Sequence, residues 1–494
     1  MKNKKLYEGF SKLIETNLPK LAVKYHIDTY NRFVSTGVQK IIDEIESIPL
    51  DDNIKLLLWK VEFGGAVLKE ADGYDREITP MEARIRDLNY TCALYVNVVP
   101  VINDVHQEPT KIKLCDFPIM IGSILDPFSN SKLTKDELIA IGEDPYDQGG
   151  YYIINGTEKI IIGVEEVANN RMVVTKEVKR GVEMARINSE KNQYIQRHMI
   201  ERKDRILYMN FSNLRNVPLI VVVRALGLET DKQIIEAISS TPEMDEEVLT
   251  NIYEFEEVRT KKDALEYLQR FVKGMGKETP EQRVQNLLNN FLLHHLGVEE
   301  DKQKLKADYL AHVASRLIKV GLGIQRGDDI DHLSNKRIRF SGYFLDVLLR
   351  SLLLGKNGLS SRIRYNYQRL TKRKKTPVVQ ALFESSYISK RIISSLATGL
   401  WVGGRVGVAQ RLDRINYVRR LSNMRAVISM LSSSQEHPEA RELHGTHWGK
   451  FCSQETPEGV HIGLRKHLAS LSTISKGITD SENERISEFV KSKL

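Results

Sequence analysis

The chain has 494 residues, of which 41% are hydrophobic and 28% are charged. This length exceeds what one hydrophobic core usually supports, so we expect two to four domains. No apolar run approaches the ~18–20 residues that a membrane span needs, and the N-terminal lysines lead into no apolar segment, so we expect neither a membrane protein nor a signal peptide. The three cysteines, Cys92, Cys115 and Cys452, are far apart, which fits a reducing, cytoplasmic compartment.

The net charge of +8 is concentrated in one part of the sequence. Residues 321–420 contain 20 Lys and Arg against 6 Asp and Glu, an excess of 14, so the remainder of the chain is net acidic. A basic segment within an otherwise balanced protein indicates a face that meets phosphate groups. A well-solvated surface of ion pairs is the alternative interpretation.

The first predicted element is an amphipathic helix near the N-terminus, where apolar residues recur every three or four positions from Ile27 to Ile48. The segments 93–102, 117–125 and 149–167 are rich in β-branched and aromatic residues and are interrupted by Gly, Pro and Asn, as is typical of strands. In the last segment, Asn155-Gly156 between two apolar runs predicts a tight hairpin turn.

The region from about Val167 to Val320 mixes two kinds of pattern. Residues 217–227, VPLIVVVRALG, read as a strand, whereas 230–240 and 280–296 have the spacing of charged, amphipathic helices. We expect an α+β insertion with its own core here, and the α+β class for the chain as a whole.

The segment LHGTHWGKFCSQETPEG concentrates groups that could bind a metal. His444, His447 and Cys452, with His461 beyond them, are chemically suitable zinc ligands, but their spacing matches no familiar zinc finger. Histidines in such a loop more often form hydrogen bonds with the backbone. We therefore expect no metal in this segment.

Two groups of carboxylates offer further candidate sites. Glu455 and Glu458 could act as an acid/base pair, but Pro457 between them favours a rigid turn in which Gly459 permits a positive φ and the carboxylates can accept backbone N–H bonds. The cluster at 328–331, with Asp at three of its four positions, resembles the carboxylates that hold Mg²⁺ in phosphoryl-transfer sites. These acids could equally cap a helix and pair with basic residues at 336–339, and local spacing leaves both readings open.

Two basic stretches, 361–379 and 411–425, interleave cations with aromatic rings in the manner of a nucleic-acid surface. A solvated helix face with two core tyrosines, Tyr365 and Tyr367, is the alternative. The sequence has no phosphate-binding loop, nucleophile elbow or dinucleotide fingerprint, so it carries no complete catalytic constellation. The candidate nucleic-acid-binding residues are Lys159, Arg362, Arg364, Arg369, Lys372, Arg373, Lys374, Lys375, Arg405, Arg411, Arg414, Arg419, Arg420 and Arg425.

Taken in order, several segments resemble the second-largest subunit of multisubunit DNA-dependent RNA polymerases, in its archaeal and eukaryotic branch. They include DDIDHLSNKRIRFSG and ELHGTHWGKFCSQETPEGVHIGL. The matching segments are 26–34, 78–96, 117–123, 149–162, 217–227, 328–342, 396–401 and 442–464. The resemblance implies a noncatalytic part of a nucleotidyltransferase, which forms one jaw and part of the wall around the active centre, binds DNA, helps to separate its strands and engages promoters.

The resemblance also implies a domain order. Because the family's full subunit is much longer, it points to the N-terminal half of a subunit that is split in some archaea, where this half is called B″. The expected parts are a protrusion domain (1–167 and 342–395), a lobe inserted into it (168–341), a fork region (396–470) and the start of an external domain or tail (471–494).

The resemblance further assigns expected roles to loops. Loops at 401–410 and 432–440 would keep nucleic-acid strands apart near the fork, and a structural wall without zinc would follow them. The fork-loop residues are Trp401, Arg405, Ser432, Gln435 and His437, and the wall residues are His447, Trp448, Glu455, Pro457, Glu458 and Gly459.

The expected partners are the C-terminal half of the same subunit, the largest subunit and other polymerase subunits, template DNA and the RNA–DNA hybrid. No catalytic residue and no cofactor is expected in this chain, because the family's Mg²⁺ ions are held by aspartates of the largest subunit. Two alternatives stay open: a free-standing, metal-dependent nuclease that uses His444, His447, Cys452 and Asp331, and an interaction module that never contacts nucleic acid.

Overall fold

The computed structural model describes residues 21–70, 72–130, 133–177, 181–272, 279–372, 378–436, 438–475, 477 and 480–492. The chain forms two compact units. The first combines Met1–Glu165 with Ile338–Leu494, and the second is the continuous segment Glu166–Arg337. The predicted α+β class is confirmed. The second unit has bounds close to those expected for the lobe, although the names protrusion, lobe and fork stay predictions.

The first unit starts with the predicted helix, which runs over residues 21–43 and includes a π-helical turn, η1 (Phe33–Gly37), before it ends as α2 (Val38–Asp43). Its apolar stripe packs into the core of this unit. The prediction was wrong at its end, because Ile48 begins strand β1 instead. Ile45 and Ile48 are buried in the same core as the helix, so their spacing reports burial and not helical structure.

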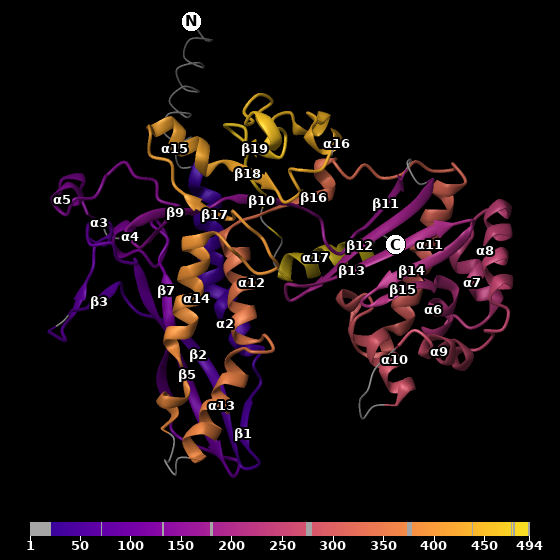
Figure 1. Cartoon of the computed structure of the whole chain (residues 1–494), viewed down its shortest axis with the longest axis horizontal. Helices are drawn as coiled ribbons and strands as arrows, with labels where there is room; N and C mark the ends of the chain where they lie inside the picture. Colours follow the sequence, from indigo (N-terminus) through magenta and orange to yellow (C-terminus); the bar gives the residue numbers. More distant parts are fainter. Residues whose placement is uncertain are drawn as a thin grey trace, which may run out of the picture. The chain divides into compact units, whose positions relative to one another are not determined.

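The main sheet of the first unit is antiparallel, with the order β1-β2-β5-β6, and β7 pairs with β5. Helices α2, α13 and α14 pack against it, and α12 packs on α2, as Figure 1 shows. The elements are β1 (Ile48–Asp51), β2 (Ile54–Phe63), β5 (Thr91–Ile102), β6 (Val105–His106), β7 (Thr110–Pro118), α12 (Ser341–Leu353), α13 (Leu359–Lys372), η5 (Val379–Leu382) and α14 (Ser385–Thr398).

Two smaller sheets of this unit join residues that precede the insertion with residues that follow it. One has the order β17-β9-β8, and in the other β10 pairs in parallel with β18, which pairs with β19. The strands are β8 (Tyr152–Ile154), β9 (Thr157–Ile161), β10 (Gly163–Val167), β17 (Ala409–Arg411), β18 (Ala426–Ser429) and β19 (Arg465–His467).

The remaining elements of the first unit are short, and β16 (Lys336–Arg339) leads the chain back into it. They are β3 (Val67–Lys69), β4 (Asp75–Glu77), α3 (Pro80–Ile85), α4 (Pro127–Asn130), α5 (Lys135–Ala140), α15 (Tyr417–Met424), α16 (Pro438–Arg441), η6 (Gly445–His447), η7 (Gly459–His461) and α17 (Asp480–Lys491). Among the described residues, no helix is both long enough and apolar enough to cross a membrane.

The predicted hairpin at Asn155-Gly156 is confirmed. These two residues connect β8 to β9, whose ends pair as Ile154 opposite Thr157. Their φ angles are 48° and 66°. Positive φ at both positions defines a type I′ turn, whose twist matches that of the strands, and Asn-Gly tolerates these angles well.

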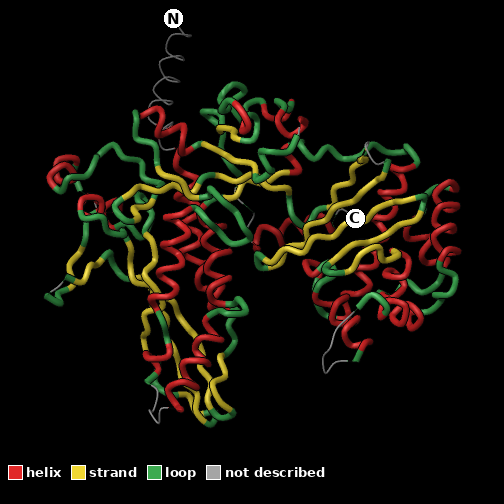
Figure 2. The backbone as a smooth tube through the Cα atoms, viewed as in Figure 1, coloured by secondary structure: helices red, strands yellow, loops and turns green. Residues whose placement is uncertain are grey.

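The second unit is a five-stranded antiparallel meander in sequence order, with helices packed on it and a hydrophobic core of its own (Figure 2). Its strands are β11 (Met172–Glu177), β12 (Val182–Lys191), β13 (Tyr194–Lys203), β14 (Ile206–Phe211) and β15 (Leu214–Pro218). Its helices are α6 (Leu219–Ala225), α7 (Asp231–Ile238), α8 (Pro242–Glu254), α9 (Lys261–Gln269), α10 (Pro280–Asn290), α11 (Gln303–Gly321), η2 (His294–Leu296), η3 (Glu300–Lys302) and η4 (Leu333–Asn335).

The helix predicted at 230–240 is confirmed, the helix predicted at 280–296 is confirmed only as far as Asn290, and a strand prediction is wrong. Helices α7 and α10 begin after the capping boxes of Thr230 and Thr279. The run at 217–227, which reads as a strand, is β15 only as far as Pro218, and continues as helix α6. All seven residues of α6 are buried. A helix that is buried on every side has no polar stripe, so its sequence cannot be told from that of a buried strand.

Three histidines lie inside the second unit. His198 is 2% exposed, and its Nε2 accepts a hydrogen bond from the backbone N–H of Leu293 at 3.1 Å. The Nδ1 atoms of His294 and His295 lie 2.9 and 2.7 Å from the Ser189 hydroxyl. Burial lowers the pKa of His198, and likewise that of His295, to about 4. These rings are therefore neutral in the folded unit at pH 7.

We expect the second unit to lose stability as the pH falls from 7 to 5. A histidine whose pKa is lowered by folding is neutral in both the folded and the unfolded state when the pH is above its unfolded pKa of about 6.5. When the pH is below about 6.5, the histidine of the unfolded chain binds a proton, whereas that of the folded unit stays neutral. The loss grows until the pH passes below about 4, the folded pKa of His198, and at pH 5 this residue alone accounts for about 2 kcal/mol. Hydrogen exchange of β12 and β13 in the intact chain measures the loss. A His198→Gln variant with the same pH dependence would contradict this origin.

Candidate nucleic-acid interface

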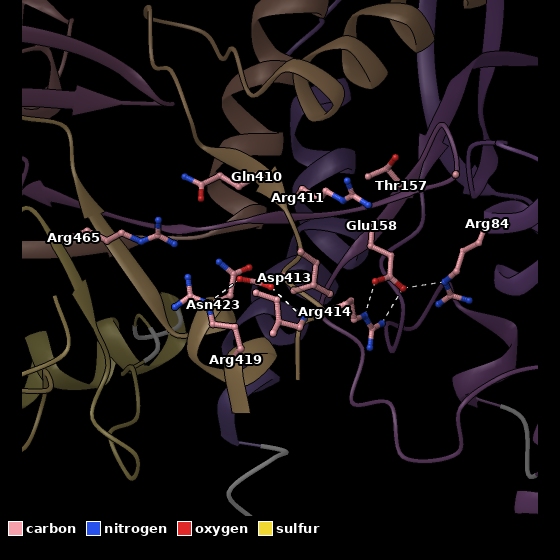
Figure 3. Close-up of a pocket in the computed structure, with 13 residues that line it drawn as sticks. Arg84, Thr157, Glu158, Gln410, Arg411, Asp413, Arg414, Arg419, Asn423 and Arg465 are labelled. Carbon is pink, nitrogen blue, oxygen red and sulfur yellow. Dashed lines mark hydrogen bonds and ion pairs between the residues drawn. The ribbon is translucent and has the colours of Figure 1, made fainter. Parts of the chain in front are cut away.

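The first unit contains a hollow of about 590 Å³, and five of the thirteen residues that line it are arginines, as Figure 3 shows. The lining comes from α3, from the turn between β8 and β9, from residues 410–423 and from β19. Two carboxylates, Glu158 and Asp413, face five arginines, so the hollow carries an excess of three positive charges. The arginines are Arg84, Arg411, Arg414, Arg419 and Arg465.

On one side of the hollow, Glu158 holds two arginines. Arg414 binds it through two hydrogen bonds, from Nε at 2.6 Å and from an amino group at 2.8 Å. Nε of Arg84 donates to the same carboxylate at 2.9 Å, and another of its nitrogens lies 3.2 Å from Glu143. This network fixes the strand β9 and the residues after β17 to each other.

Behind this network, Asp147 fixes the position of α15. It accepts hydrogen bonds from the Tyr151 hydroxyl at 2.7 Å and from the N–H of Gly149 at 2.9 Å, and it pairs with Arg414 and Arg420. Although burial raises the pKa of Asp147, these hydrogen bonds and cations outweigh it and leave the pKa below its ordinary value. Asp147 is therefore ionised and neutralises the positive charge of Arg420.

The N-terminal helix fixes the other end of α15. His26 Nε2 lies 2.8 Å from the Met424 carbonyl oxygen, to which the Tyr25 hydroxyl also donates at 3.2 Å. His26 is fully buried, and burial lowers its pKa to about 4. A segment near the start of the chain thus holds an arginine-bearing helix that is distant in sequence.

On the other side of the hollow, positive charge exceeds negative charge. Arg419 pairs with Asp413 at 2.7 Å. Within the described ranges, no carboxylate pairs with Arg411 or Arg465. Burial lowers the pKa of Arg465, and the neighbouring cation of Arg419 lowers it further, although Glu455 and Asp413 act in the opposite direction. An anion between these guanidinium groups would relieve their repulsion, so this side of the hollow is electrostatically suited to a phosphate.

A buried ion pair lies beneath Arg465, on the adjacent strand positions. Lys466 of β19 contacts Glu165 of β10 at 2.6 Å, and the two side chains are only 8% and 3% exposed. The Lys466 ammonium also lies 5.2 Å from the ring centre of Phe451. The pair connects β10 and β19, the two strands that flank β18, and so stabilises the strand that carries Arg465.

The structure brings together three of the predicted nucleic-acid-binding residues, Arg411, Arg414 and Arg419, in the hollow. Three others point into the protein. Nζ of Lys159 donates to the Ala397 carbonyl oxygen at 3.0 Å, and Arg420 and Arg425 are 3% and 7% exposed. Arg425 donates to the backbone carbonyl groups of Leu468 and Ala469. Their contacts favour a structural role, and no finding tests contact with nucleic acid.

Four of the other predicted basic residues, Arg362, Arg364, Arg369 and Lys372, lie on α13. The guanidinium carbon of Arg362 lies 3.3 Å from the ring centre of Tyr387, and that of Arg369 lies 5.9 Å from Tyr365. The exposed side of α13 carries Arg364, Arg369 and Lys372. Tyr365 is itself 63% exposed, so the alternative of two core tyrosines fails for it. Arg373, Lys374 and Lys375 lie outside the described residues.

The predicted fork loops differ in burial. Trp401 is 6% exposed, packs on Phe344 and forms a backbone hydrogen bond with Arg405 at 2.8 Å. The Ser432 hydroxyl lies 2.8 Å from that of Ser434. A guanidinium nitrogen of Arg441 lies 3.4 Å from the Gln435 carbonyl oxygen, and His437 lies outside the described residues.

The residues predicted for the wall form a packed loop, in which His447 is buried against Phe451 and Trp448 is 67% exposed. Nδ1 of His444 lies 2.7 Å from the Thr446 hydroxyl. In the part of the chain that the structure describes, no three His, Cys, Asp or Glu residues are placed to hold a metal.

The two carboxylates of this loop, Glu455 and Glu458, are exposed, and the side chain of Glu458 caps no helix. The Ser422 hydroxyl donates to Glu455, and Glu458 precedes the short helix η7. The positive φ predicted for Gly459 is confirmed at 75°. Pro457 lies between these residues in a turn whose Thr456 hydroxyl donates to the Arg465 carbonyl oxygen at 3.0 Å.

The aspartate cluster of the second unit is neutralised by the protein. Asp328 pairs with Arg316 at 2.6 Å and accepts a hydrogen bond from the Val174 N–H, while Asp331 pairs with Lys336 at 2.8 Å, as predicted. These donors occupy the oxygen atoms that a Mg²⁺ ion would need. The cluster does not fit a metal site.

Sequence reasoning missed Arg84 and Arg465, although both line the hollow. Each is a single arginine among mixed neighbours, so local composition gives no signal. Arg84 lies in segment 78–96 and Arg465 directly follows segment 442–464, so the family resemblance was the only signal that pointed to these neighbourhoods.

Comparison with known proteins shows to which family the chain belongs. Residues 21–390 match the family described as RNA polymerase beta subunit, and residues 410–474 match RNA polymerase Rpb2, domain 3. The chain is 38% identical to the DNA-directed RNA polymerase subunit Rpo2N of Methanococcus vannielii, over 95% of both chains, and 38% identical to Rpo2N of Methanocaldococcus jannaschii, also over 95% of both. It is 39% identical to Rpo2 of Saccharolobus solfataricus, over 94% of this chain and 41% of the longer one.

The chain therefore belongs to the RNA polymerase beta-subunit family, and corresponds to the N-terminal half of the second subunit. It is a subunit of DNA-directed RNA polymerase and so part of a nucleotidyltransferase.

Proposed function

We propose that this chain is the B″-type half of a split second subunit, and that it joins the C-terminal half, the largest subunit and other subunits in a cytoplasmic polymerase. It forms one jaw and part of the wall around the active centre, and its fork loops help to keep nucleic-acid strands apart and to engage promoters. The relatives named Rpo2N, which it matches along nearly their whole length, support the split form.

The observation that carries the nucleic-acid role is the arginine hollow. Arg411 and Arg465 face it without a pairing carboxylate among the described residues, and Arg419 repels Arg465. Phosphate groups of a DNA strand or of the RNA–DNA hybrid supply the missing negative charge. Such contacts hold the backbone in place and carry no sequence information.

In this proposal the chain holds no metal of its own, and the Mg²⁺ ions belong to the largest subunit. The neutralised aspartates Asp328 and Asp331 support this assignment. A free-standing nuclease would need ligands from His444, His447 and Cys452, whose contacts are with the protein itself or whose side chain is exposed. The polymerase role is therefore favoured over the nuclease.

We expect an Arg411→Ala/Arg465→Ala variant of the intact chain to bind an RNA–DNA hybrid oligonucleotide more weakly and with less dependence on salt. Each phosphate contact contributes about 0.7–0.9 to the slope of log K against log salt concentration, so the slope should become shallower by about 1.5. Fluorescence anisotropy at several salt concentrations measures the slope.

The matched control is Arg205→Ala/Arg215→Ala, which removes the same charge from exposed positions of the second unit. It should leave the slope unchanged. Equal slopes for the two double variants would mean that net charge and not the hollow binds the nucleic acid, and would exclude this part of the proposal.

A further inference from the structure

The turn that begins α15, next to the arginine hollow, carries three apolar side chains that face solvent. Ile415, Tyr417 and Val418 are 80%, 48% and 73% exposed. Among the large apolar side chains that the structure describes, that of Ile415 is the most exposed. Single exposed apolar residues are common on protein surfaces, but three that lie so close in the sequence form a local apolar surface. We call these three residues the apolar knob.

Hydrogen bonds hold the apolar knob in place. The backbone N–H of Ile415 donates to the Asp413 carboxylate at 3.2 Å. The Tyr417 hydroxyl accepts a hydrogen bond from the Gln148 side chain at 3.3 Å, and the guanidinium carbon of Arg420 lies 5.2 Å from the centre of the tyrosine ring. The exposure of the knob is therefore a fixed feature of the fold.

The apolar knob is continuous with the arginine hollow. Ile415 lines the hollow together with Arg411 and Arg465. Arg414 and Arg419 directly precede and follow the knob in the sequence. A ligand that fits both surfaces has anionic groups for the arginines and apolar faces for the knob, and a nucleic-acid strand has both, in its phosphates and its bases.

The pairing state of the strand decides whether its bases can reach the apolar knob. In a duplex, the base faces are stacked on one another and are not available to a side chain. In an unpaired strand, the bases can turn outward and lie against apolar or aromatic side chains. The knob and the hollow together therefore fit an unpaired strand better than a duplex.

We infer that the apolar knob contacts the base faces of an unpaired nucleic-acid strand whose phosphate groups occupy the arginine hollow. This inference rests on the proposed function, which assigns phosphate groups to the hollow, and it adds that the bound strand is unpaired. Contact between a base face and the knob removes apolar surface from water, so the bases add affinity without any readout of sequence. The contact also hinders re-pairing, because a base that lies against the knob cannot stack within a duplex.

Fluorescence anisotropy of the intact chain with two oligonucleotides of equal length tests this inference. One is an unpaired thymine strand, and the other has the same phosphates but abasic sugars. The unchanged chain should bind the thymine strand at least about fivefold more tightly, because contacts with the base faces add to those with the phosphates. An Ile415→Ser/Val418→Ser variant should reduce this preference to less than about twofold. It should bind the abasic strand as the unchanged chain does, which also shows that the variant is folded.

The matched control is Val105→Ser/Ile324→Ser, which replaces a valine and an isoleucine that are 60% and 52% exposed at other positions of the chain. It should keep the full preference for the thymine strand. The Arg411→Ala/Arg465→Ala variant should weaken the binding of both strands by a similar factor, because both carry the same phosphates. If this arginine variant binds both strands as tightly as the unchanged chain, the nucleic-acid role of the hollow is refuted. If it weakens both, but the Ile415→Ser/Val418→Ser variant keeps the preference, only the contact between knob and bases is overturned, and the apolar face is left for a protein partner.

Two further oligonucleotides define the bound strand. A duplex of the same length offers no base faces, so the Ile415→Ser/Val418→Ser variant should bind it as tightly as the unchanged chain does. If this variant loses as much affinity for the duplex as for the thymine strand, the knob does not contact unpaired bases and the inference is overturned. An unpaired uracil strand of RNA completes the comparison, and the tighter of the thymine and uracil strands shows whether the knob takes DNA or RNA.

Discussion

A Glu165→Leu variant should be less stable in its first unit by about 3–5 kcal/mol. The substitution leaves the Lys466 ammonium, which is 8% exposed, without the carboxylate that lies 2.6 Å away. A buried cation without a counter-ion has lost its hydration and has no compensating electrostatic interaction. The ring of Phe451 at 5.2 Å compensates only in small part. Urea unfolding followed by tryptophan fluorescence reports on this unit, because Trp59, Trp401 and Trp448, the only tryptophans of the chain, all belong to it.

The double variant Glu165→Leu/Lys466→Met should recover most of this loss. It removes both charges and therefore both desolvation costs, and apolar side chains of similar volume fill the space. As a surface comparison, Glu62→Leu breaks the pair of Glu62 with Lys111, whose side chains are 37% and 51% exposed, and should change the midpoint little. A single Glu165→Leu variant as stable as the unchanged chain would show that water reaches the pair.

Replacement of Gly463 by alanine is expected to cost about 3 kcal/mol or more, whereas the same replacement of Gly459 costs about 1–2 kcal/mol. Both residues have positive φ, 72° and 75°, so the backbone strain is the same. A methyl group at Gly459 meets nothing within 4 Å, but at Gly463 it collides with the backbone carbonyl of Arg441. The difference between the two variants is therefore the cost of the collision.

The collision cannot be relieved cheaply, because Arg441 is itself held in the loop. Its guanidinium donates to the carbonyl oxygens of Val460 and Ile462 at 2.8 and 3.0 Å. Movement of its backbone would break these hydrogen bonds, which close the loop next to Arg465. Differences in the urea midpoint measure the cost. Equal midpoints for Gly459→Ala and Gly463→Ala would mean that the loop is free to shift.

Local features of the fold were predictable where one residue type has one physical use. Asn155-Gly156 predicted its hairpin because asparagine and glycine adopt positive φ at the least cost, although less obvious pairs such as Asn192-Gln193 also do so in this chain. The strand prediction for residues 219–225 was wrong for the opposite reason, because isoleucine and valine occur both in buried strands and in buried helices. The helix prediction up to Ile48 was wrong at its end because residues of the helix and of the following strand are buried in the same core.

The candidate site was predictable in composition but not in geometry. The sequence identified the arginines near residue 420, yet Arg419 lines the hollow while Arg420 is buried against Asp147. Adjacent residues of a helix point about 100° apart, so a count of charges cannot say which of them faces a ligand. Arg84 and Arg465 enter the site only through sheet pairing and helix packing between distant segments, which local patterns do not contain.

The parallel pairing of β10 with β18 has a consequence for biosynthesis. Gly163–Glu165 pairs with Val427–Ser429, and the whole inserted unit lies between them in the sequence. During translation the inserted unit is completed before β17 and β18 have been synthesised. Until then, the edges of β9 and β10 that pair with these strands have unpaired hydrogen-bonding groups. Open edges of apolar strands invite aggregation. We therefore expect the nascent polypeptide to be prone to aggregation through these edges until translation has passed Ser429.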